Sequence, residues 1–584
     1  MSDRLPLCFD RARRRAGRGL MFAFLALLSL LVGCSRDSSA PRRDQPDGPP
    51  VSAADSSAEQ PAPPNSLELV FTYGSEKQKW IEEVTEAFNH GDHKLADGRA
   101  IFVRGYPMGS GELIDEVLSG RRHAHLTSPA SGAFIALANA ESRAKTGKDL
   151  VGNTQNLVLS PVVIAMWKPM AEALGWGKKS VGWTDILDLA RNPMGWAAHG
   201  QPRWGTFKFG HTHPEYSNSG LISLFATVYA AAGKATNLKL DDVSDPKVAK
   251  YLHDIEAAVV HYGSSTGFFG AKMFAGGPQY LSAAVLYENM VIDSYGSDNH
   301  LPFPIVAIYP KEGTFWSDHP VAVVEREWVT PAHREAADLY MKFLLDRPQQ
   351  ERAMAFGFRP SDPQIALAAP LDAAHGIDPK EPKTTLPVPS VEVMDAIKKL
   401  WHQNKKHANI ALVLDTSGSM KLEERMTNAR IGAAHLISML DDEDEVSFLP
   451  FNDVVRFDAR KVSMKDGRQD LIKRINGLFA DGGTSLYDAI DLAYKELLDN
   501  PSPDKISAIV VLTDGKDENS RLKYEELLAR FDSERQPIRI FTIGYSADAE
   551  KTVLKGIADA TQAKFYAGTP ANILEVFKEI STFF

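Results

Sequence analysis

Cysteine is nearly absent from the sequence, which has only Cys8 and Cys34 among its 584 residues. From Ser35 onward the chain contains no thiol, and this excludes a fold that is held together by disulfides. The length is ample for a hydrophobic core to take that role. An apolar fraction of 44% and a charged fraction of 24% are ordinary for a globular protein.

An excess of positive charge is also missing. The formal net charge is −10 at pH 7, so we expect no nucleic-acid partner. The sequence patterns of several enzyme classes are absent as well, because we find no nucleophile elbow, no zinc-protease motif and no phosphate-binding loop. These absences favour a binding protein over an enzyme.

The apolar run near the N-terminus, Leu20–Val32, is shorter than the roughly 20 residues that a membrane-spanning helix needs. Arginines between Arg11 and Arg18 precede it, and a basic stretch before a short apolar run is typical of a secretory signal. The run ends in LVGC, which resembles a bacterial lipobox. The resemblance implies that Cys34 receives lipid and becomes the new N-terminus, and the alternative is an uncleaved anchor helix.

The expected lipid anchor places the protein on the cell membrane or outer membrane, facing the periplasm or the exterior. Residues 34–65 are rich in Ser, Pro, Ala and Asp and cannot bury enough apolar surface to fold, so we interpret them as a disordered tether. We therefore expect a signal peptide at 1–33, this tether, and globular domains at 66–404 and 405–584.

Strands alternate with helices through both globular parts, and this alternation predicts an α/β fold. The patterns predict helices at 77–89, 111–119, 131–140, 221–232, 246–261, 333–346, 390–403 and 427–440. They predict strands at 67–73, 100–106, 157–167, 283–292, 303–310, 408–415, 444–453, 454–457, 506–515, 538–545 and 563–568.

Several segments of the part at 66–404 share one family pattern. They are the strand–Gly–Ser–helix opening at 67–76, SPVVIAMWKPMAEALGWG at 160–177, GHTHPEYSNSG at 210–220, YENMVID at 287–293 and RPQQERAMAFGFRP at 347–360. Together they resemble extracellular solute-binding proteins that feed ABC importers. The resemblance implies a periplasmic-binding-protein-like domain, in which crossover strands join two α/β lobes and a small solute or an oxyanion lies between the lobes.

Small polar residues precede several predicted helices of this domain. Helix starts present free N–H groups that attract anions and carbonyl oxygens, and small side chains let a ligand approach the backbone. We therefore expect a cleft that is lined by Ser75, Ser110, Ser128, Ser219 and Tyr287. Helix capping explains each position by itself equally well, so only the convergence of these residues would make a site.

The loop HTHPE contains His211, His213 and Glu215 at alternate positions, a spacing that metal ligands sometimes have. A proline lies within the loop, and alternating polar residues in such loops are more often ordinary loop polarity. We therefore favour the interpretation without a metal.

Oxygen-bearing side chains follow two apolar strands of the part at 405–584 and begin one of its helices. Asp415, Ser417 and Ser419 come directly after a strand whose apolar run suits burial on both faces. Thr484 follows two glycines at a helix start, and Asp514 follows another apolar strand. Because ligands of open α/β sheets bind beyond the carboxyl ends of the strands, these side chains are candidates for one site.

The motifs Asp-x-Ser-x-Ser, Gly-Gly-Thr and Thr-Asp-Gly occur here in the order found in the von Willebrand factor A domain. The part at about 405–584 resembles this family, which implies a doubly wound, Rossmann-like sheet and a metal-ion-dependent adhesion site. By this resemblance the metal ligands are Asp415, Ser417, Ser419, Thr484 and Asp514. The expected cofactor is Mg²⁺, or another divalent cation such as Mn²⁺ or Ca²⁺.

Mg²⁺ prefers oxygen ligands in near-octahedral geometry and usually keeps some water. Three hydroxyls and two carboxylates leave the shell incomplete, and in the family a carboxylate of a partner fills the open position. We therefore expect a protein partner that bears an acidic residue. Two alternatives remain: residues 415–419 cap only the next helix, or the metal serves only stability.

These expectations describe a membrane-anchored extracytoplasmic binding protein. Its C-terminal domain binds a protein partner through a metal ion, and its N-terminal cleft binds a small solute. The alternative is a solute receptor of an ABC importer, in which the C-terminal domain serves only for docking.

The lipobox interpretation predicts that Cys34→Ser releases the protein from membranes, because the residue that carries the lipid is lost. Fractionation of cells that produce the parent chain or the variant, followed by immunodetection, measures the effect. Unchanged membrane fractionation of the variant would contradict the predicted lipid anchor.

Overall fold

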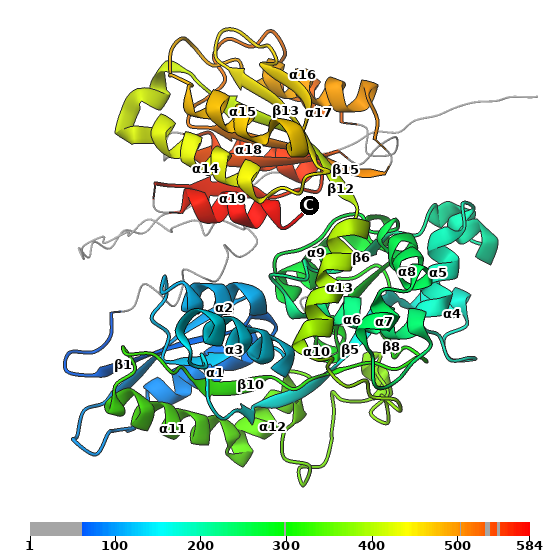
Figure 1. Ribbon diagram of the computed structural model, residues 1–584, viewed down its shortest axis with the longest axis vertical. Coiled ribbons are helices and arrows are strands. Elements are labelled where there is room, and N and C mark those ends of the chain that lie inside the picture. The colour runs from blue at the N-terminus through cyan, green and yellow to red at the C-terminus, as the bar shows by residue number, and fades with distance from the viewer. Residues whose placement is uncertain (1–60, 297–299, 503, 532–537, 546–548, 571) are drawn as a thin grey trace, which may run out of the picture. The chain divides into compact units, whose positions relative to one another are not determined.

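The computed structural model describes residues 61–296, 300–502, 504–531, 538–545, 549–570 and 572–584. The predicted signal peptide, Cys34 and most of the predicted tether lie outside these residues. The described chain contains three β-sheets, two within residues 67–360 and one within residues 407–568, and helices pack on their faces (Figure 1). The expected α/β class is therefore confirmed. The domain boundaries at 65/66 and 404/405 stay predictions.

The first lobe comprises residues 67–156 and 320–358 and is built on a five-stranded sheet in the order β2-β1-β3-β10-β4. Its core lies where α1 packs against β2 and α11 packs against β1, with Phe71, Trp80, Phe88 and Tyr340 all buried. Its elements are β1 (Leu67–Gly74), η1 (Ser75–Lys77), α1 (Gln78–Asn89), β2 (Ile101–Met108), α2 (Ser110–Leu118), β3 (Leu126–Ser128), α3 (Gly132–Thr146), β4 (Gln155–Asn156), β10 (Pro320–Val323), α11 (Pro331–Leu345) and α12 (Arg347–Ala355).

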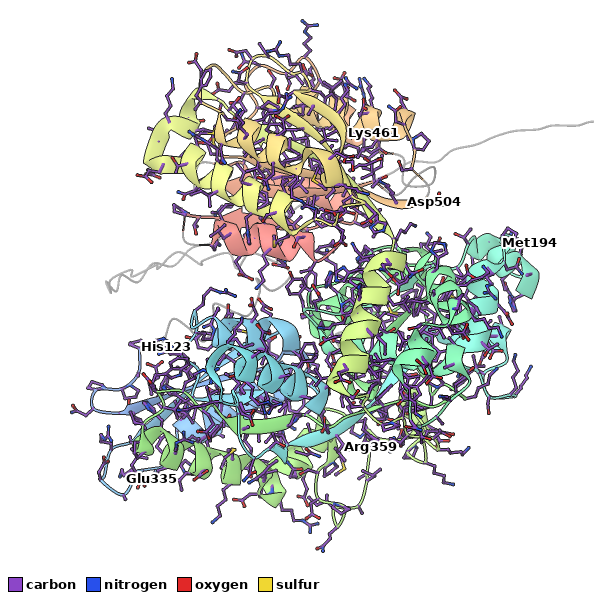
Figure 2. All side chains as sticks on the ribbon, in the orientation of Figure 1. His123, Met194, Glu335, Arg359, Lys461 and Asp504 are labelled. Atoms are coloured by element: carbon purple, nitrogen blue, oxygen red, sulfur yellow. The ribbon has the colours of Figure 1, made fainter. Side chains whose placement is uncertain are left out.

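The second lobe comprises residues 158–317 and 359–404, and its long strand β5 pairs with β7, β8, β9 and β11, all antiparallel. Side chains fill the space between its sheet and helices (Figure 2). Its elements are β5 (Val158–Trp167), α4 (Lys168–Leu174), α5 (Trp183–Arg191), η2 (Gly195–His199), η3 (Pro202–Trp204), β6 (Phe209–Gly210), α6 (Asn218–Ala232), α7 (Leu240–Val243), α8 (Pro246–Glu256), α9 (Thr266–Tyr280), β7 (Ala283–Tyr287), α10 (Glu288–Asp293), β8 (Ile305–Ile308), β9 (Trp316–Ser317), β11 (Arg359–Pro360), η4 (Ala373–His375) and α13 (Val391–Asn404).

The chain crosses between the lobes at short segments. One crossing lies between Asn156 of β4 and Val158 of β5, and another lies between Ser317 of β9 and Pro320 of β10. A third connects α12 to β11. These crossings are the connections that a two-lobed solute-binding fold was expected to have, and they bring residues 317–319 between the two sheets.

The C-terminal domain is built on a six-stranded sheet in the order β14-β13-β12-β15-β16-β17. All neighbouring pairs are parallel except β13–β14 at the edge. Its elements are β12 (His407–Asp415), η5 (Gly418–Glu424), α14 (Arg425–Met439), β13 (Glu445–Phe451), β14 (Ala459–Ser463), α15 (Met464–Asn476), α16 (Leu486–Asp499), β15 (Lys505–Thr513), α17 (Tyr524–Leu528), β16 (Arg539–Tyr545), α18 (Lys551–Ala560), β17 (Phe565–Gly568) and α19 (Ile573–Ser581).

Strand β12 is buried on both faces, as its unbroken apolar sequence predicts. Ile410, Leu412 and Leu414 pack in a cluster with residues of α14, α15 and α19, whereas Ala411 and Val413 pack with residues of α16, α17 and α18. Helices therefore cover both faces of the sheet, and the expected doubly wound architecture is confirmed.

The strand predicted at 283–292 is wrong in its second half. Strand β7 ends at Tyr287, and helix α10 begins at Glu288. The Glu288 carboxylate is buried and accepts two hydrogen bonds from Arg359 on β11, at 2.8 and 2.6 Å (Arg359 is labelled in Figure 2). An apolar run suits a buried helix as well as a buried strand. The ion pair joins residues that are far apart in sequence, and it lies where the chain changes from strand to helix.

The short strand predicted at 454–457 is also wrong. Of its four residues, Val455 alone pairs, in a single antiparallel bridge with Phe451. Val454 N donates to the Asn452 side chain at 2.8 Å, so the chain turns here instead of continuing a ladder. The strand that pairs with β13 is β14, which begins at Ala459. Helix α9 was not predicted, because it contains several glycines and Pro278, with a kink at Gly277.

Among the described residues, no helix combines the length and the apolar character that crossing a membrane requires.

The two lobes approach each other closely at Gly111, so we expect the substitution Gly111→Ala to push the lobes apart. A Cβ on Gly111 of α2 would lie 1.8 Å from the carbonyl oxygen of Glu215 in the second lobe, and backbone atoms cannot yield to it cheaply. We expect a longer distance between spin labels at the exposed positions Glu86 and Glu172, measured by double electron–electron resonance in a chain whose two native cysteines are replaced.

Gly132→Ala is the matched control, because a Cβ at this helix start would meet only the Asp318 carboxylate, at 3.4 Å. The control should keep the parent distance. A parent-like distance in Gly111→Ala would show that this contact does not set the separation of the lobes.

Candidate functional sites

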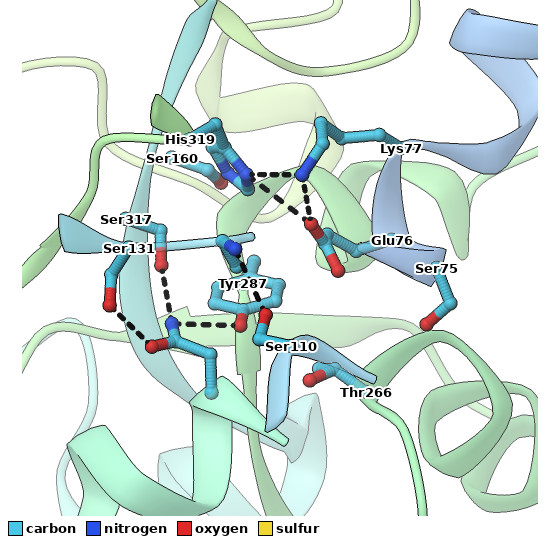
Figure 3. Close-up of polar contacts among 12 residues, drawn as sticks. Ser75, Glu76, Lys77, Ser110, Ser131, Ser160, Thr266, Tyr287, Ser317 and His319 are labelled. Atoms are coloured by element: carbon cyan, nitrogen blue, oxygen red, sulfur yellow. Dashed lines mark hydrogen bonds and ion pairs between the residues drawn. The ribbon is translucent and has the colours of Figure 1, made fainter. Parts of the chain in front are cut away.

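The first candidate site lies between the lobes, where five helices begin (Figure 3). The first lobe contributes the starts of η1, α2 and α3, and the second contributes those of α6 and α9. Residues of the crossing at 317–319 and Tyr287 at the end of β7 complete the group.

The structure brings the predicted cleft residues Ser75, Ser110 and Tyr287 together (Figure 3). Ser75 Oγ accepts a hydrogen bond from Gly267 N of the other lobe at 3.3 Å, and Ser110 Oγ accepts one from Ala130 N at 2.9 Å. Both hydroxyls therefore already have protein partners, and the contact at Ser75 joins the two lobes.

The other two predicted serines differ in their surroundings. Ser219 Oγ bonds Thr212 Oγ1 at 2.8 Å and Thr266 Oγ1 at 2.9 Å, so it joins helices of the second lobe. Ser128 Oγ, at the end of β3, is buried and has no hydrogen-bond partner among the described residues. Ser128 is therefore free to bond a ligand, whereas Ser219 serves the packing of its own lobe.

Asn218 is the central polar residue of this cleft, and it was not among the predicted site residues. Its Oδ1 accepts from Ser131 Oγ at 2.6 Å, and its Nδ2 donates to Tyr287 OH at 3.0 Å and to Ser317 Oγ at 3.1 Å. One side chain thus joins the first lobe, the second lobe and the crossing. The motif Asn-Ser-Gly at a helix start marked the place, but it did not distinguish Asn218 from Ser219.

Glu76, Lys77 and His319 form a buried charged cluster that the sequence analysis also missed (Figure 3). Lys77 Nζ lies 2.7 Å from Glu76 Oε1 and 3.1 Å from His319 Nδ1. Burial would raise the pKa of Glu76, but the Lys77 ammonium and His319 overcome it and lower this pKa to about 2. Adjacent Glu and Lys at a helix start usually face solvent, so the sequence carried no signal for the cluster.

His319 offers a second unpartnered polar atom at the cleft. Burial, with the nearby Lys77 ammonium, lowers its pKa to about 4, so the ring is neutral at pH 7. Nδ1 lies 3.1 Å from Lys77 Nζ and 3.3 Å from Glu76 Oε1. Nε2 is buried and has no hydrogen-bond partner among the described residues.

Most of the helix starts at the cleft already have protein partners. Gly111 N of α2 donates to Tyr216 O at 2.9 Å, and Gly132 N of α3 donates to Asp318 Oδ1 at 2.9 Å. The free N–H groups that we expected at these helix starts are therefore mostly bonded to other parts of the protein. Contacts across the cleft occupy these backbone donors, whereas Ser128 Oγ and His319 Nε2 have no partner among the described residues.

Among the described residues, no group of three His, Cys, Asp or Glu residues is placed to hold a metal ion, and side chains of the HTHPE loop have other partners. His211 Nε2 lies 3.1 Å from Glu256, and Glu215 lies 3.1 Å from His402. Burial lowers the pKa of His213 to about 3, so its ring is neutral and packs against Trp401.

The second candidate site lies at the carboxyl edge of the C-terminal sheet. Asp415 ends β12, and its Oδ2 accepts from Thr513 Oγ1 at 2.5 Å while its Oδ1 accepts from Ser417 N at 2.8 Å. Ser417 Oγ lies 3.0 Å from Ser419 Oγ, which donates to Asp514 Oδ1 at 2.8 Å. The pairing of β12 with β15 therefore brings four of the five predicted residues together.

Thr484, the fifth predicted residue, lies beside them. A Cβ on Gly515 would lie 3.8 Å from Ser419 Oγ and 3.9 Å from Thr484 Oγ1, so the two hydroxyls flank the same glycine. The backbone fixes this arrangement, because Gly418 N donates to Gly482 O at 2.9 Å. All five side chains thus converge from three separate segments.

Charge at this site is partly balanced by Arg425, which the sequence analysis did not identify. Its guanidinium donates to Asp514 Oδ2 at 2.8 Å, and both side chains are buried. Burial raises the pKa of the Asp415 carboxyl to about 6, although hydrogen bonds from Thr513 and Ser417 act in the opposite direction. Arg425 begins α14, where a charged residue in an amphipathic pattern gave no sign of burial.

Two family models match the chain, in agreement with these two folds. The model described as a bacterial extracellular solute-binding protein matches residues 69–359, and the model described as a von Willebrand factor type A domain matches residues 409–579.

Curated relatives match the chain at low identity. An uncharacterized protein of Mycobacterium tuberculosis is 19% identical over 453 residues, which cover 72% of this chain and 62% of the relative. The chain thus spans less than two thirds of that relative's length. The calcium-activated chloride channel regulator 3A-1 of Mus musculus is 26% identical over 178 residues, 30% of this chain and 19% of the relative.

Solved structures resemble each part separately. The sulfate-binding protein SubI of Mycobacterium tuberculosis H37Rv is 20% identical with a TM-score of 0.36, and the match covers 56% of this chain and 93% of the SubI chain. The periplasmic binding protein AfuA of Actinobacillus pleuropneumoniae is 12% identical with a TM-score of 0.40, and the match covers 58% of this chain and 99% of the AfuA chain. A von Willebrand factor type A protein of Catenulispora acidiphila is 23% identical with a TM-score of 0.28, and the match covers 31% of this chain and 43% of that protein's chain.

The family models and the two sheet architectures agree on one description of the chain. It carries a bacterial extracellular solute-binding protein domain followed by a von Willebrand factor type A domain.

Proposed function

We propose that this protein is a membrane-anchored, extracytoplasmic binding protein with two sites. The C-terminal domain binds a protein partner through a divalent metal ion, and the interlobe cleft of the N-terminal domain binds a small polar solute. The observation that carries the proposal is the convergence of five oxygen-bearing side chains from three segments at the carboxyl edge of one sheet.

The spacing of these oxygens suits Mg²⁺. An octahedron with ion–oxygen distances of about 2.1 Å has neighbouring ligand atoms about 3.0 Å apart. Ser417 Oγ and Ser419 Oγ are 3.0 Å apart, and Ser419 Oγ and Asp514 Oδ1 are 2.8 Å apart. Asp415, Ser417, Ser419, Thr484 and Asp514 fit the ion in number and type of donor, and they are the residues that would hold it.

Charge explains why an acidic partner suits the site. A bound Mg²⁺ would supply an electron-poor coordination position. Among the five proposed ligands only Asp415 and Asp514 are charged, so they would neutralise the ion without a surplus of negative charge. Arg425 lies 2.8 Å from Asp514 and 3.4 Å from Glu423. The open position of the ion, in a partly buried place where screening is weak, would attract a carboxylate from outside.

The cleft supports the solute part of the proposal. Among the described residues, Ser128 Oγ and His319 Nε2 are buried polar atoms without partners, and such groups are costly unless a ligand or water bonds them. Asn218, Tyr287 and Ser317 add amide and hydroxyl groups. The Tyr287 and Ser317 hydroxyls accept from Asn218 and can donate their own protons, so we propose a solute that carries acceptor oxygens, such as an oxyanion or a carboxylate.

The proposed location rests on the N-terminal domain, since solute-binding domains of this kind suggest a position outside the cytoplasm. Lipidation of Cys34 remains part of the proposal, supported by the LVGC sequence.

Replacement of Asp415 by alanine should weaken Mg²⁺ binding at least about 100-fold, which corresponds to about 2.8 kcal/mol. The change removes one of two carboxylates from the proposed coordination shell. Isothermal titration calorimetry of the full chain with MgCl₂ gives the dissociation constant. Ser419→Ala, which removes one hydroxyl and disturbs the buried strand less, should weaken binding by about tenfold.

Asp481→Ala is the matched control, because this exposed aspartate lies at the same edge of the sheet but not in the cluster. It should bind Mg²⁺ like the parent chain. Parent-like binding by both Asp415→Ala and Ser419→Ala would rule out the proposed metal site.

Solute binding in the cleft predicts that a ligand raises the melting temperature of the parent chain but not of Asn218→Ala. A solute at 100 times its dissociation constant stabilises the folded state by about 2.7 kcal/mol. Scanning fluorimetry with sulfate, phosphate, citrate and glucose measures the shift, and we expect at least one of the anions to act.

Asn89→Ala is the control for general destabilisation, since Asn89 bonds both backbone groups of Val103 within the first lobe. This variant should keep the shift caused by the solute. An equal shift in Asn218→Ala would place the binding elsewhere, and a glucose shift alone would argue against an oxygen-rich anion as the ligand.

A further inference from the structure

Three large apolar side chains of the C-terminal domain face solvent to an unusual degree. Their exposed fractions are 55% for Leu422, 57% for Val454 and 78% for Phe479. Ile431 on α14, at 48%, ranks next among the large apolar residues of this domain that the structure describes. Single exposed apolar residues are ordinary, so the position of these three is what matters.

All three lie in loops at the carboxyl edge of the sheet. Leu422 lies in η5 after β12, Val454 follows β13, and Phe479 precedes the Gly-Gly-Thr segment that leads to α16. Each loop therefore also contains, or adjoins, residues of the proposed metal site.

Hydrogen bonds join these loops into one surface. Asp481 N donates to Thr416 O at 2.7 Å, and the Asn452 amide donates to Asp481 O at 2.9 Å. Lys421 Nζ lies 3.4 Å from Asp481 Oδ1. Leu422, Val454 and Phe479 are each one or two residues away from these contacts, so they lie in the segments that adjoin the metal site.

The loop that carries Leu422 is also strained. Glu423 and Glu424 have φ angles of 47° and 56°, in the left-handed region that side chains other than glycine rarely adopt. Consecutive residues of this kind persist where the surroundings hold them, and they concentrate at functional sites. Here they turn the chain between the metal-site loop and α14, and Leu422 stays exposed.

We propose that Leu422, Val454 and Phe479 form an apolar rim that docks a segment of a partner protein in which one Asp or Glu is flanked by large apolar side chains. The inference rests on the proposed function, because the carboxylate of that segment would complete the metal site. The rim would bury the flanking side chains, and it would distinguish this partner from other proteins with exposed acidic residues.

The charges around the rim favour a single acidic residue over a polyacidic segment. Glu423 and Asp481 are exposed, and Asp453 lies in the loop that carries Val454. These carboxylates would repel further acids next to the one that reaches the ion. Apolar neighbours avoid that repulsion and match the rim, so they are the flanking residues that the surface selects.

The test uses a phage-displayed library of cyclic peptides with a fixed central Glu and three random residues on each side. The full chain selects peptides in MgCl₂, and elution with EDTA keeps those that depend on the ion. We expect enrichment of Leu, Ile, Phe and Trp beside the Glu. The strongest peptide should bind the Leu422→Ser, Val454→Ser, Phe479→Ser triple variant at least tenfold more weakly than the parent.

Two controls separate the rim from the metal site. Ile431→Ser removes an equally apolar, exposed side chain from α14 and should leave the peptide affinity unchanged. The triple variant should bind Mg²⁺ like the parent in calorimetry, whereas Asp415→Ala should lose both Mg²⁺ and the peptide.

The outcomes distinguish the two proposals. Three results would overturn the proposed rim: selected peptides that lack flanking apolar residues, no ion-dependent peptide at all, or parent-like peptide binding by the triple variant. If the parent chain still binds Mg²⁺, the proposed metal site stands in each of these cases. Absence of Mg²⁺ binding by the parent chain would overturn the metal site and the rim with it.

Discussion

The register of three parallel strands is the constraint on which the C-terminal site depends. Leu414 of β12 pairs with Leu512 of β15, and Asp415 pairs with Phe451 of β13. Parallel strands end at the same edge, so this pairing brings the residues that follow each strand together. A shift by one residue would turn Asp415 toward the other face of the sheet. Backbone hydrogen bonds of the sheet therefore set the distances between the oxygens.

The convergence of these five side chains could be predicted from the sequence because the relevant signals are local. An apolar strand that ends in Asp415, and glycines before Thr484, can be recognised without knowledge of tertiary contacts. Arg425 and Asn218 were missed because their roles depend on partners 89 and 69 residues away, Asp514 and Tyr287. The cleft prediction included Ser75, which joins the two lobes, but at the start of α6 it named Ser219 and not its neighbour Asn218.

The fold was predicted in the same uneven way. Strands β12 and β15 are buried on both faces, and their sequences are nearly continuous apolar runs. Both could therefore be recognised as strands from the sequence. The run at 283–292 is apolar except at Glu288 and Asn289, and the change from strand to helix coincides with the ion pair of Glu288 and Arg359. At 454–457 the Asn452 side chain competes with the ladder for Val454 N. Both errors follow from single side-chain contacts that periodicity does not contain.

The crossing at 317–320 has a mechanical consequence. Rotation of one lobe against the other requires torsion changes in the crossings, and this one contains His319, whose φ of 40° is already unusual. Ser317 and His319 also contribute polar atoms to the cleft. The pivot and the contact surface are therefore the same few residues. A molecule held there would act directly on the hinge, and the stiffness of that hinge would enter its affinity.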